Sequence, residues 1–384
     1  MGYVSVKGGV EAIENAKELV EFYRIKDRTQ PLEIKQIQAQ LRLAIDKIMG
    51  EGSLYAPEYA ALALKQMEGD VLEAAFVLRA FRATLQRKYY SEIISTRDMF
   101  IKRKISSSFR EIPGGQVLGA TRDYIQRMLD TEKYNEDGKS IEQFLENFEK
   151  KIDKDKLENV KTFGKVIDLL RSEGLLMPVE ETYDKTVKDV TREAVKFPAP
   201  RSVTLQMLAR GETGSMMALA YSCMRGFGMG HGTIGELRYG SVKILVTDVK
   251  GRKRYIGSIN VTECEMVTKV NTSKKTKIPY FAIGYGLVYG QNETKAICMS
   301  ILDRGIRSKD NSSPANNQEF VLYHSEGVEA MGFTNHLKLP HYVTFQSGLN
   351  NLRESVKRNA EKAEEQNKFY KAIFKQSKKE EVND

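Results

Sequence analysis

The spacing of apolar residues changes along this chain, and the change limits the folds open to it. Up to about residue 85 apolar side chains recur every three or four positions, as Ile34, Ile37 and Leu41 do, which predicts helices. Beyond residue 240 they alternate, in the runs 242–246 and 259–267, which predicts strands. We expect an α+β protein, with a helical N-terminal part followed by a mixed, mainly antiparallel sheet region with flanking helices.

Glycines and prolines mark where the early helices begin and end. Gly50 and Gly52 predict the end of the second helix. Pro57 opens a third, because proline is tolerated at the first helical position, and Gly69 with Asp70 separates that helix from a fourth. We interpret these helices as core packing without chemistry.

Composition divides the chain into four expected regions. The first, 1–130, is helical and includes a basic segment with a glycine turn. Region 131–200 is a charged insertion or linker with one or two helices and no assigned site residue. Region 201–345 is the α+β domain with the candidate active site, and 346–384 is a charged helix and tail.

Two acidic residues occupy an otherwise apolar strand face. Glu263 and Glu265 share the face of Ile259, Val261 and Val267, because strand side chains alternate. Buried carboxylates are costly unless they are paired, metal-bound or functional. Their separation of about 6–7 Å along a strand suits a general acid/base pair or metal ligation. The alternative is a bulge or strand end that turns both to solvent.

A basic segment supplies candidate phosphate-binding residues. Arg103, Lys104 and Arg110 flank a serine run and the turn 113–115, and a helix is expected to start near Thr121. Glycine backbones and a helix N-terminus favour anions, and basic side chains add charge-assisted hydrogen bonds. The alternative is an exposed basic strand with an ordinary turn.

Five glycines interrupt the stretch 225–238, which presents His231 and Glu236. So many glycines indicate unusual backbone angles or close contact with another group. A loop that wraps a ligand and a flexible connector both fit this pattern.

The stretch 280–306 predicts a strand, a turn at 284–286, a second strand and a helix capped near Asn292. Asp303 lies in that helix. It either faces a site or pairs on the surface with a residue one turn away.

Two of the four histidines, His336 and His341, flank Pro340. Neither a straight strand nor a helix points side chains five positions apart to one place. Pro340 lets a strand that carries His336 turn, so that both imidazoles reach one point. A two-histidine metal half-site, completed by a third group or a partner chain, and a pair of packed histidines at a corner are both open.

Charge and cysteine content restrict partners and compartment. The net charge of +9 favours anionic partners, either nucleic acid or a polyphosphorylated small molecule. The absence of tryptophan and of basic blocks interleaved with aromatics argues against nucleic acid. No membrane span or signal peptide is expected. Cys223, Cys264 and Cys298 form no disulfide pattern, which suits the cytoplasm, and they cannot hold an iron–sulfur cluster alone.

Several blocks together resemble one family. IPGGQVLG, VTECEMV, GYGLVYG, EFVLYHSEGVEAMGF and HLKLPHY, in this order, are similar to the PhnI subunit family of bacterial carbon–phosphorus lyase. The opening VSVKGG and the block ALALKQMEGDVLEAAFVLRAFR look like it too. The resemblance covers most of the chain, apart from 131–199 and the part beyond about residue 356.

The resemblance implies a cytoplasmic enzyme of phosphonate use. Such a subunit acts alone as a purine nucleosidase on ATP or GTP. With its partners it replaces the base at the ribose anomeric carbon by an alkylphosphonate, giving ribose 1-alkylphosphonate 5-triphosphate. The implied partners are PhnG, PhnH, PhnL and the radical-SAM subunit PhnJ, with two copies of the chain in the assembly.

The resemblance also implies a zinc site at the interface with the radical-SAM subunit, held here by His336 and His341. The other roles follow from charge and spacing alone. Glu263 and Glu265, with Asp303 behind them, are the candidate catalytic acids for an oxocarbenium-like transition state. The basic segment is the candidate triphosphate site, closed by the loop 226–235. A non-catalytic scaffold that contributes the zinc site is the alternative function.

Overall fold

The computed structural model describes residues 9–152, 163–177, 187–226, 231–270, 280–308 and 313–362. The chain forms two compact units. One spans Glu18–Ala330, and the other combines Met1–Lys17 with Met331–Asp384.

The N-terminal part of the larger unit is helical, as predicted. Its helices are α2 (Ile34–Gln40), α3 (Arg42–Gly52), α4 (Pro57–Gln66) and α5 (Val71–Thr84). Proline occupies the first position of α4, and the Asp70 side chain accepts hydrogen bonds from two backbone amides at the start of α5. The apolar stripes of these helices pack into one core that includes Ile48, Leu64 and Leu78.

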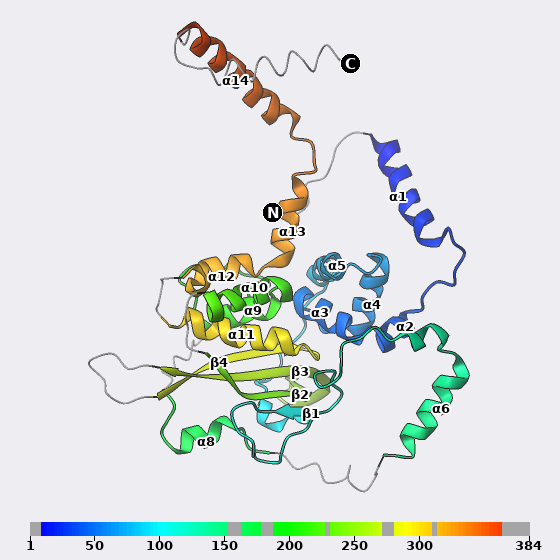
Figure 1. Ribbon diagram of the computed structural model, residues 1–384, viewed down its shortest axis with the longest axis vertical. Coiled ribbons are helices and arrows are strands. Elements are labelled where there is room, and N and C mark those ends of the chain that lie inside the picture. Colours follow the sequence, from blue (N-terminus) through cyan, green and yellow to red (C-terminus); the bar gives the residue numbers. More distant parts are fainter. Residues whose placement is uncertain are drawn as a thin grey trace, which may run out of the picture. The chain divides into compact units, whose positions relative to one another are not determined.

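A four-stranded antiparallel sheet with the order β1-β2-β3-β4 forms the centre of the same unit (Figure 1). The strands are β1 (Phe100–Ile105), β2 (Thr233–Thr247), β3 (Lys253–Val270) and β4 (Tyr280–Tyr289). The α+β prediction is therefore confirmed, and the alternating runs form the two long central strands.

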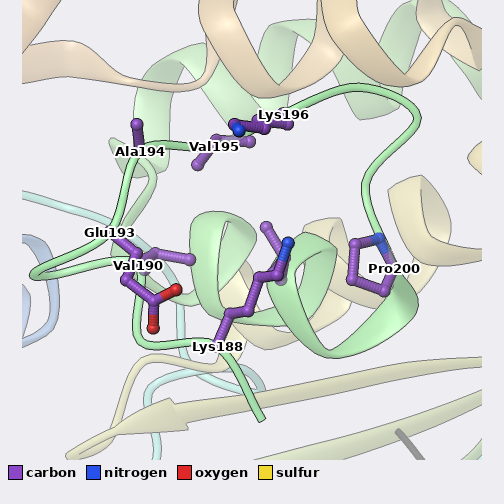
Figure 2. Close-up of a pocket in the computed structure, with 8 residues that line it drawn as sticks. Lys188, Val190, Glu193, Ala194, Val195, Lys196 and Pro200 are labelled. Atoms are coloured by element: carbon purple, nitrogen blue, oxygen red, sulfur yellow. The ribbon is translucent and has the colours of Figure 1, made fainter. Parts of the chain in front are cut away.

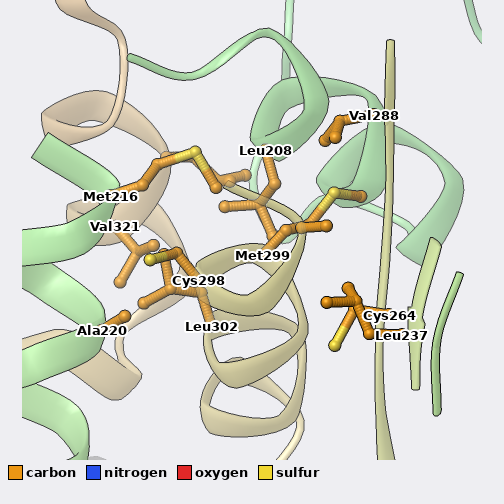
Figure 3. Packing of buried hydrophobic residues seen from close by; sticks show 12 residues of the cluster. Leu208, Met216, Ala220, Leu237, Cys264, Val288, Cys298, Met299, Leu302 and Val321 are labelled. Atoms are coloured by element: carbon orange, nitrogen blue, oxygen red, sulfur yellow. The ribbon is translucent and has the colours of Figure 1, made fainter. Parts of the chain in front are cut away.

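Helices cover one face of the sheet, which we call the helical face (Figure 1). They are α9 (Arg201–Arg210), α10 (Thr213–Tyr221), α11 (Glu293–Ile306) and α12 (Gln318–His324), with short turns at Ser222–Gly226 and Pro314–Asn316. Asn292 caps α11, as expected. The main core lies between α11 and the sheet and includes Cys264, Val288, Met299 and Leu302 (Figure 3).

The turn predicted at 284–286 is wrong, because β4 runs through it without a break. Both glycines let α11 approach the strand. A Cβ on Gly284 would lie 2.0 Å from the Ser300 carbonyl oxygen, and one on Gly286 would lie 2.1 Å from that of Ala296. These two positions therefore require glycine because the helix packs closely on the strand, and not because the chain turns there.

The opposite face of the sheet, which we call the polar face, carries two small apolar clusters. One is built on Val242 and Val261, and the other joins Val267 to Ile167 and Leu170. The latter two belong to α8 (Ile167–Ser172). Between the clusters lies a row of charged side chains, described below.

Region 131–200 contains η2 (Thr131–Asn135) and α6 (Gly138–Glu149) in addition to α8. The helical structure expected in this region is confirmed: its described residues form the two α-helices and the short 3-10 helix η2. No residue of α6 is buried. The helix expected near Thr121 is wrong, because residues 121–130 form turns and irregular backbone. The short η1 (Thr96–Asp98) precedes β1.

The remaining helices are α1 (Val10–Ile25), α13 (Gly327–His336) and α14 (Tyr342–Lys362). The charged C-terminal helix is confirmed. The strand expected to carry His336 is wrong, because this residue ends α13. Within the described ranges no helix combines the length and apolarity needed to cross a membrane.

Candidate active site

Charged side chains from three strands meet on the polar face. In the antiparallel register Lys104 pairs with Arg238, Arg238 with Glu263, and Glu236 with Glu265. Directly opposed residues point to the same face of a sheet. All five side chains are buried. Together with Lys165 they form what we call the charged row.

Lys165 joins the row from outside the sheet, just before α8. Its Nζ lies 2.9 Å from Oε1 of Glu263 and 3.0 Å from Oε1 of Glu265. The two carboxylates therefore share one ammonium group, which offsets their mutual repulsion. The sequence assigned no site residue to 131–200, so this contact was missed.

Glu263 accepts more hydrogen bonds than the other two acids of the row. Its Oε2 accepts from Nε of Arg238 at 3.1 Å and also from Nη2, while Oε1 accepts from Thr96 Oγ1 at 2.7 Å and from the Tyr285 hydroxyl at 2.9 Å. Burial raises the pKa of Glu263, but Arg238 and Lys165 outweigh it and lower the pKa to about 2. Glu263 is therefore an anion at neutral pH.

Glu265 lies two positions further along the same strand, but its pKa is shifted in the opposite direction. Burial raises its pKa, Lys165 partly opposes this, and the charge of Glu263 raises the pKa further. Its Oε2 is buried and has no hydrogen-bond partner among the described residues. A pair of carboxylates whose pKa values are pushed apart is the arrangement that acid–base enzymes use.

Glu236 holds the segment before α8 against the sheet. Its Oε2 accepts a hydrogen bond of 3.1 Å from the Val166 amide, and its Oε1 lies 3.5 Å from Nζ of Lys104. Burial lowers the pKa of Lys104, although Glu236 partly restores it, and Lys104 also donates to the Pro113 carbonyl. Glu236 belongs to β2 rather than to a loop.

The glycine-rich loop itself lies partly outside the described residues, because 227–230 are not among them. His231 is exposed. The ligand-loop role of His231 and Glu236 therefore stays a prediction.

The row contains three acidic and three basic side chains, so its charges balance when all six are ionised. Such a network has two interpretations: a set of ion pairs that anchors the segment 163–172, or a catalytic pair held in place by cations. The opposite pKa shifts of Glu263 and Glu265 favour the second.

The three candidate phosphate-binding residues do not converge. Lys104 belongs to the charged row, whereas Arg103 points to the helical face, where its Nε lies 2.7 Å from Oε1 of Glu293 and its Nη2 pairs with Asp123. Arg110 is exposed. The structure therefore separates Arg103 from the acids, and phosphate binding by these residues stays a prediction.

Asp303 lies in α11, on the helical face. It accepts a 3.0 Å hydrogen bond from the Tyr285 amide and pairs with Arg307, one helical turn away, and with Arg201. The structure places it apart from Glu263. The two acids are linked through Tyr285, whose amide binds Asp303 and whose hydroxyl binds Glu263.

His336 and His341 do come together, with ring centroids 5.3 Å apart. Nδ1 of His341 lies 2.6 Å from the Leu339 carbonyl, and Nδ1 of His336 contacts the Phe333 carbonyl. This leaves the two Nε2 atoms available to a metal ion. A structural zinc has four ligands, and no cluster of three metal-ligating side chains occurs in the described part of the chain. The residues fit half of a zinc site.

A solvent-open hollow with an empty volume of about 230 Å³ lies beside α9 (Figure 2). None of the residues predicted from the sequence lines it. Its lining consists of Lys188, Val190, Glu193, Ala194, Val195, Lys196, Pro200 and Val203.

Comparison with known proteins agrees with the resemblance found in the sequence. The model of the family described as bacterial phosphonate metabolism protein (PhnI) matches residues 2–359. A putative C-P lyase subunit protein, HtxH, of Stutzerimonas stutzeri is 44% identical over 92% of this chain and 95% of its own length.

Two relatives carry the name alpha-D-ribose 1-methylphosphonate 5-triphosphate synthase subunit PhnI. The one from Rhizobium meliloti is 43% identical over 91% of this chain and 94% of its own length. The one from Escherichia coli is 41% identical over 91% of this chain and 97% of its own length. The chain belongs to the PhnI family of bacterial phosphonate metabolism proteins.

Proposed function

We propose that this chain is a ribosyl-transfer subunit that acts at the anomeric carbon of ATP or GTP. Alone it releases the purine as a nucleosidase; with partner subunits in the cytoplasm it forms ribose 1-alkylphosphonate 5-triphosphate. The proposal rests on sequence identity. This chain is 43% and 41% identical, over at least nine-tenths of each chain, to two proteins named alpha-D-ribose 1-methylphosphonate 5-triphosphate synthase subunit PhnI.

The charged row supplies the acids that this reaction needs. Breaking the bond between ribose and purine leaves the electron pair on the base and positive charge on the sugar ring. The anionic Glu263 stabilises that charge, and the protonated form of Glu265 donates its proton to the leaving purine. An oxygen of water or of the phosphonate then forms the new bond to the anomeric carbon. An attacking water gives its proton to the Glu265 carboxylate, which restores the acid, whereas an anionic phosphonate oxygen has no proton to lose.

Solvent exposure indicates the side from which substrate arrives. The side chains of Lys165 and Glu265 are each 10% exposed, whereas that of Glu263 is 1% exposed. The ribose is therefore expected to approach from the side of Lys165. The Lys165 ammonium group would then release one of its two carboxylates and bind an oxygen of the substrate instead.

The second candidate function is a scaffold that contributes a zinc site to an interface with the radical-SAM subunit PhnJ. The convergence of His336 and His341 favours it. A Zn²⁺ ion bound there fixes the geometry of the chains that share it. The remaining ligands would then come from the partner subunit.

The deciding experiment is to incubate the purified full chain with ATP and to measure free adenine by chromatography, with and without a chelator. The proposed function predicts adenine release by the chain alone. The scaffold alternative predicts none until PhnG, PhnH, PhnJ and PhnL are added. If adenine release persists in the presence of the chelator, the reaction at Glu263 and Glu265 does not require a metal ion at the histidine pair.

A further inference from the structure

Four arginines gather where α5 and α9 meet the turn at 189–191. Arg79 and Arg82 lie one helical turn apart on α5, and Arg87 follows the end of that helix. Arg210 is the last residue of α9. We call these four residues the arginine cluster.

Shared partners hold three members of the cluster together. Arg79 donates to Oε1 of Glu326 at 2.6 Å, and Nε of Arg210 lies 3.0 Å from Oε2 of the same carboxylate. Arg210 also donates to the Val190 carbonyl at 3.2 Å. Arg79 and Arg210 therefore form ion pairs with the same carboxylate, although their own positive charges repel each other.

The same turn binds Arg87. Its guanidinium pairs with Asp189 and donates to Thr191 Oγ1 at 3.3 Å. The turn 189–191 thus brings Arg87 and Arg210 toward each other. Glu326 and Asp189 are already engaged by these arginines, and Glu329 adds a further negative charge near Arg210.

Arg82 lies near these anchored neighbours, and its side chain has no hydrogen bond or ion pair within the described residues. Its Nε and Nη1 are buried and unpartnered. Burial lowers its pKa, as do the positive charges of Arg210, Arg79 and Arg87, with Asp189 opposing. Arg82 as a whole is half-buried, but two of its three guanidinium nitrogens are buried without an acceptor. Buried donors without an acceptor are costly, and they call for a partner that the described part of the chain does not provide.

We propose that the arginine cluster binds a tetrahedral oxyanion of the phosphate or phosphonate class, with Arg82 as its central donor. A guanidinium presents two parallel N–H groups that match such an anion, and a further negative charge would offset the mutual repulsion of the four arginines. This site is separate from the charged row and from the basic segment around Arg103. It is tested by binding alone and does not depend on the proposed reaction.

The cluster is open to solvent on the side of the turn. Arg87 keeps 31% of its side chain exposed. The segment that binds Arg87 and Arg210 continues into the hollow of Figure 2, where Lys188 and Lys196 are lining residues. Glu193 is the one acid among the lining residues, so the two lysines leave this lining with a net positive charge, along which a chain of phosphates can lie.

The test is calorimetric titration of the full chain with tripolyphosphate, inorganic phosphate, methylphosphonate and ATP. Arg82→Gln removes the central donor, and Arg127→Gln removes an exposed arginine as a matched change in charge. We expect Arg82→Gln to weaken tripolyphosphate binding about tenfold or more, and Arg127→Gln to leave it unchanged. Preference for ATP and tripolyphosphate would identify a nucleotide phosphate chain, and preference for methylphosphonate would identify the phosphonate; either supports the site.

Thermal unfolding distinguishes a ligand-binding arginine from a structural one. Without anion, Arg82→Gln is expected to keep or raise the unfolding midpoint, because it relieves repulsion among like charges. Tripolyphosphate should raise the midpoint of the wild type and of Arg127→Gln but not that of Arg82→Gln. Equal tripolyphosphate affinity in all three proteins would overturn the proposal, whatever the midpoints are.

Discussion

The ammonium group of Lys165 lies 3.0 Å from Oε1 of Glu265, so a residue from the charged region 131–200 contacts the central strand of the sheet. The same ammonium contacts Glu263 at 2.9 Å. One cation therefore acts on the pKa values of both candidate catalytic acids and ties the segment before α8 to the polar face.

Replacing Lys165 by Met should destabilise the protein strongly. The change leaves two buried carboxylates without their shared cation, and breaking a buried ion pair costs about 3–5 kcal/mol. Denaturant unfolding at pH 7 measures the difference, with Lys139→Met on the exposed helix α6 as the control. A loss no larger than that of the control would show that Lys165 is not held by the acids.

Stability should fall in acid partly because of Glu263. Its pKa in the folded protein, about 2, lies below the ordinary value of 4.5, so its stabilising effect is present above pH 4.5 and is lost as the pH falls toward 2. The interval corresponds to about 3 kcal/mol. The unfolding free energy of Glu263→Gln, measured from pH 6 to pH 2, should therefore decline less steeply than that of the wild type.

The variant Glu265→Gln is the control for the pH dependence measured with Glu263→Gln, because the pKa of Glu265 is raised rather than lowered. A raised carboxyl pKa favours folding at low pH and loses this effect as the pH rises through the folded value. Glu265→Gln should accordingly not flatten the decline in acid. Parallel curves for wild type and Glu263→Gln would contradict the assignment of the low pKa to Glu263.

Gly286→Ala should destabilise the packing of α11 on β4. The added methyl group would lie 2.1 Å from the Ala296 carbonyl oxygen, so helix and strand must move apart, at a cost of about 2 kcal/mol or more. Gly138→Ala, where the added methyl meets nothing within 4 Å, is the control and should be neutral or slightly stabilising. Equal midpoints for the two variants in thermal unfolding would refute the packing role of Gly286.

Sequence periodicity was sufficient for most of the fold, because the helical stripes and strand alternation describe faces that are buried in the structure. The common face of Glu263 and Glu265 followed from strand geometry alone. The turn at 284–286 was wrong because glycine next to an approaching helix looks, in sequence, like glycine in a turn. The strand at His336 was wrong because α13 continues up to that residue.

The partners of the acids could not be predicted. Lys165 and Glu265 are separated by 100 positions, and nothing local to Lys165 marks it as different from the many lysines around it. Arg238 lies opposite Glu263 only because of a register that includes a bulge between Ile244 and Leu245. Such long-range pairings depend on the tertiary structure rather than on local pattern.

The histidine pair should determine zinc content. His336→Ala or His341→Ala removes one of the two proposed ligands, which lie close together, and each change should reduce zinc in the purified multisubunit complex to near background. His324→Ala, another exposed histidine whose Nδ1 contacts a backbone carbonyl, is the control. Metal analysis showing equal zinc in all the variants would exclude this half-site.

The most direct test of the central claim is adenine release from ATP by Glu263→Gln and Glu265→Gln, each checked for folding by circular dichroism. If these acids carry the ribosyl chemistry, both variants lose turnover by about a hundredfold or more, and Glu265→Gln, which lacks the protonatable group, also loses its dependence on pH. Wild-type turnover in both folded variants would contradict the account.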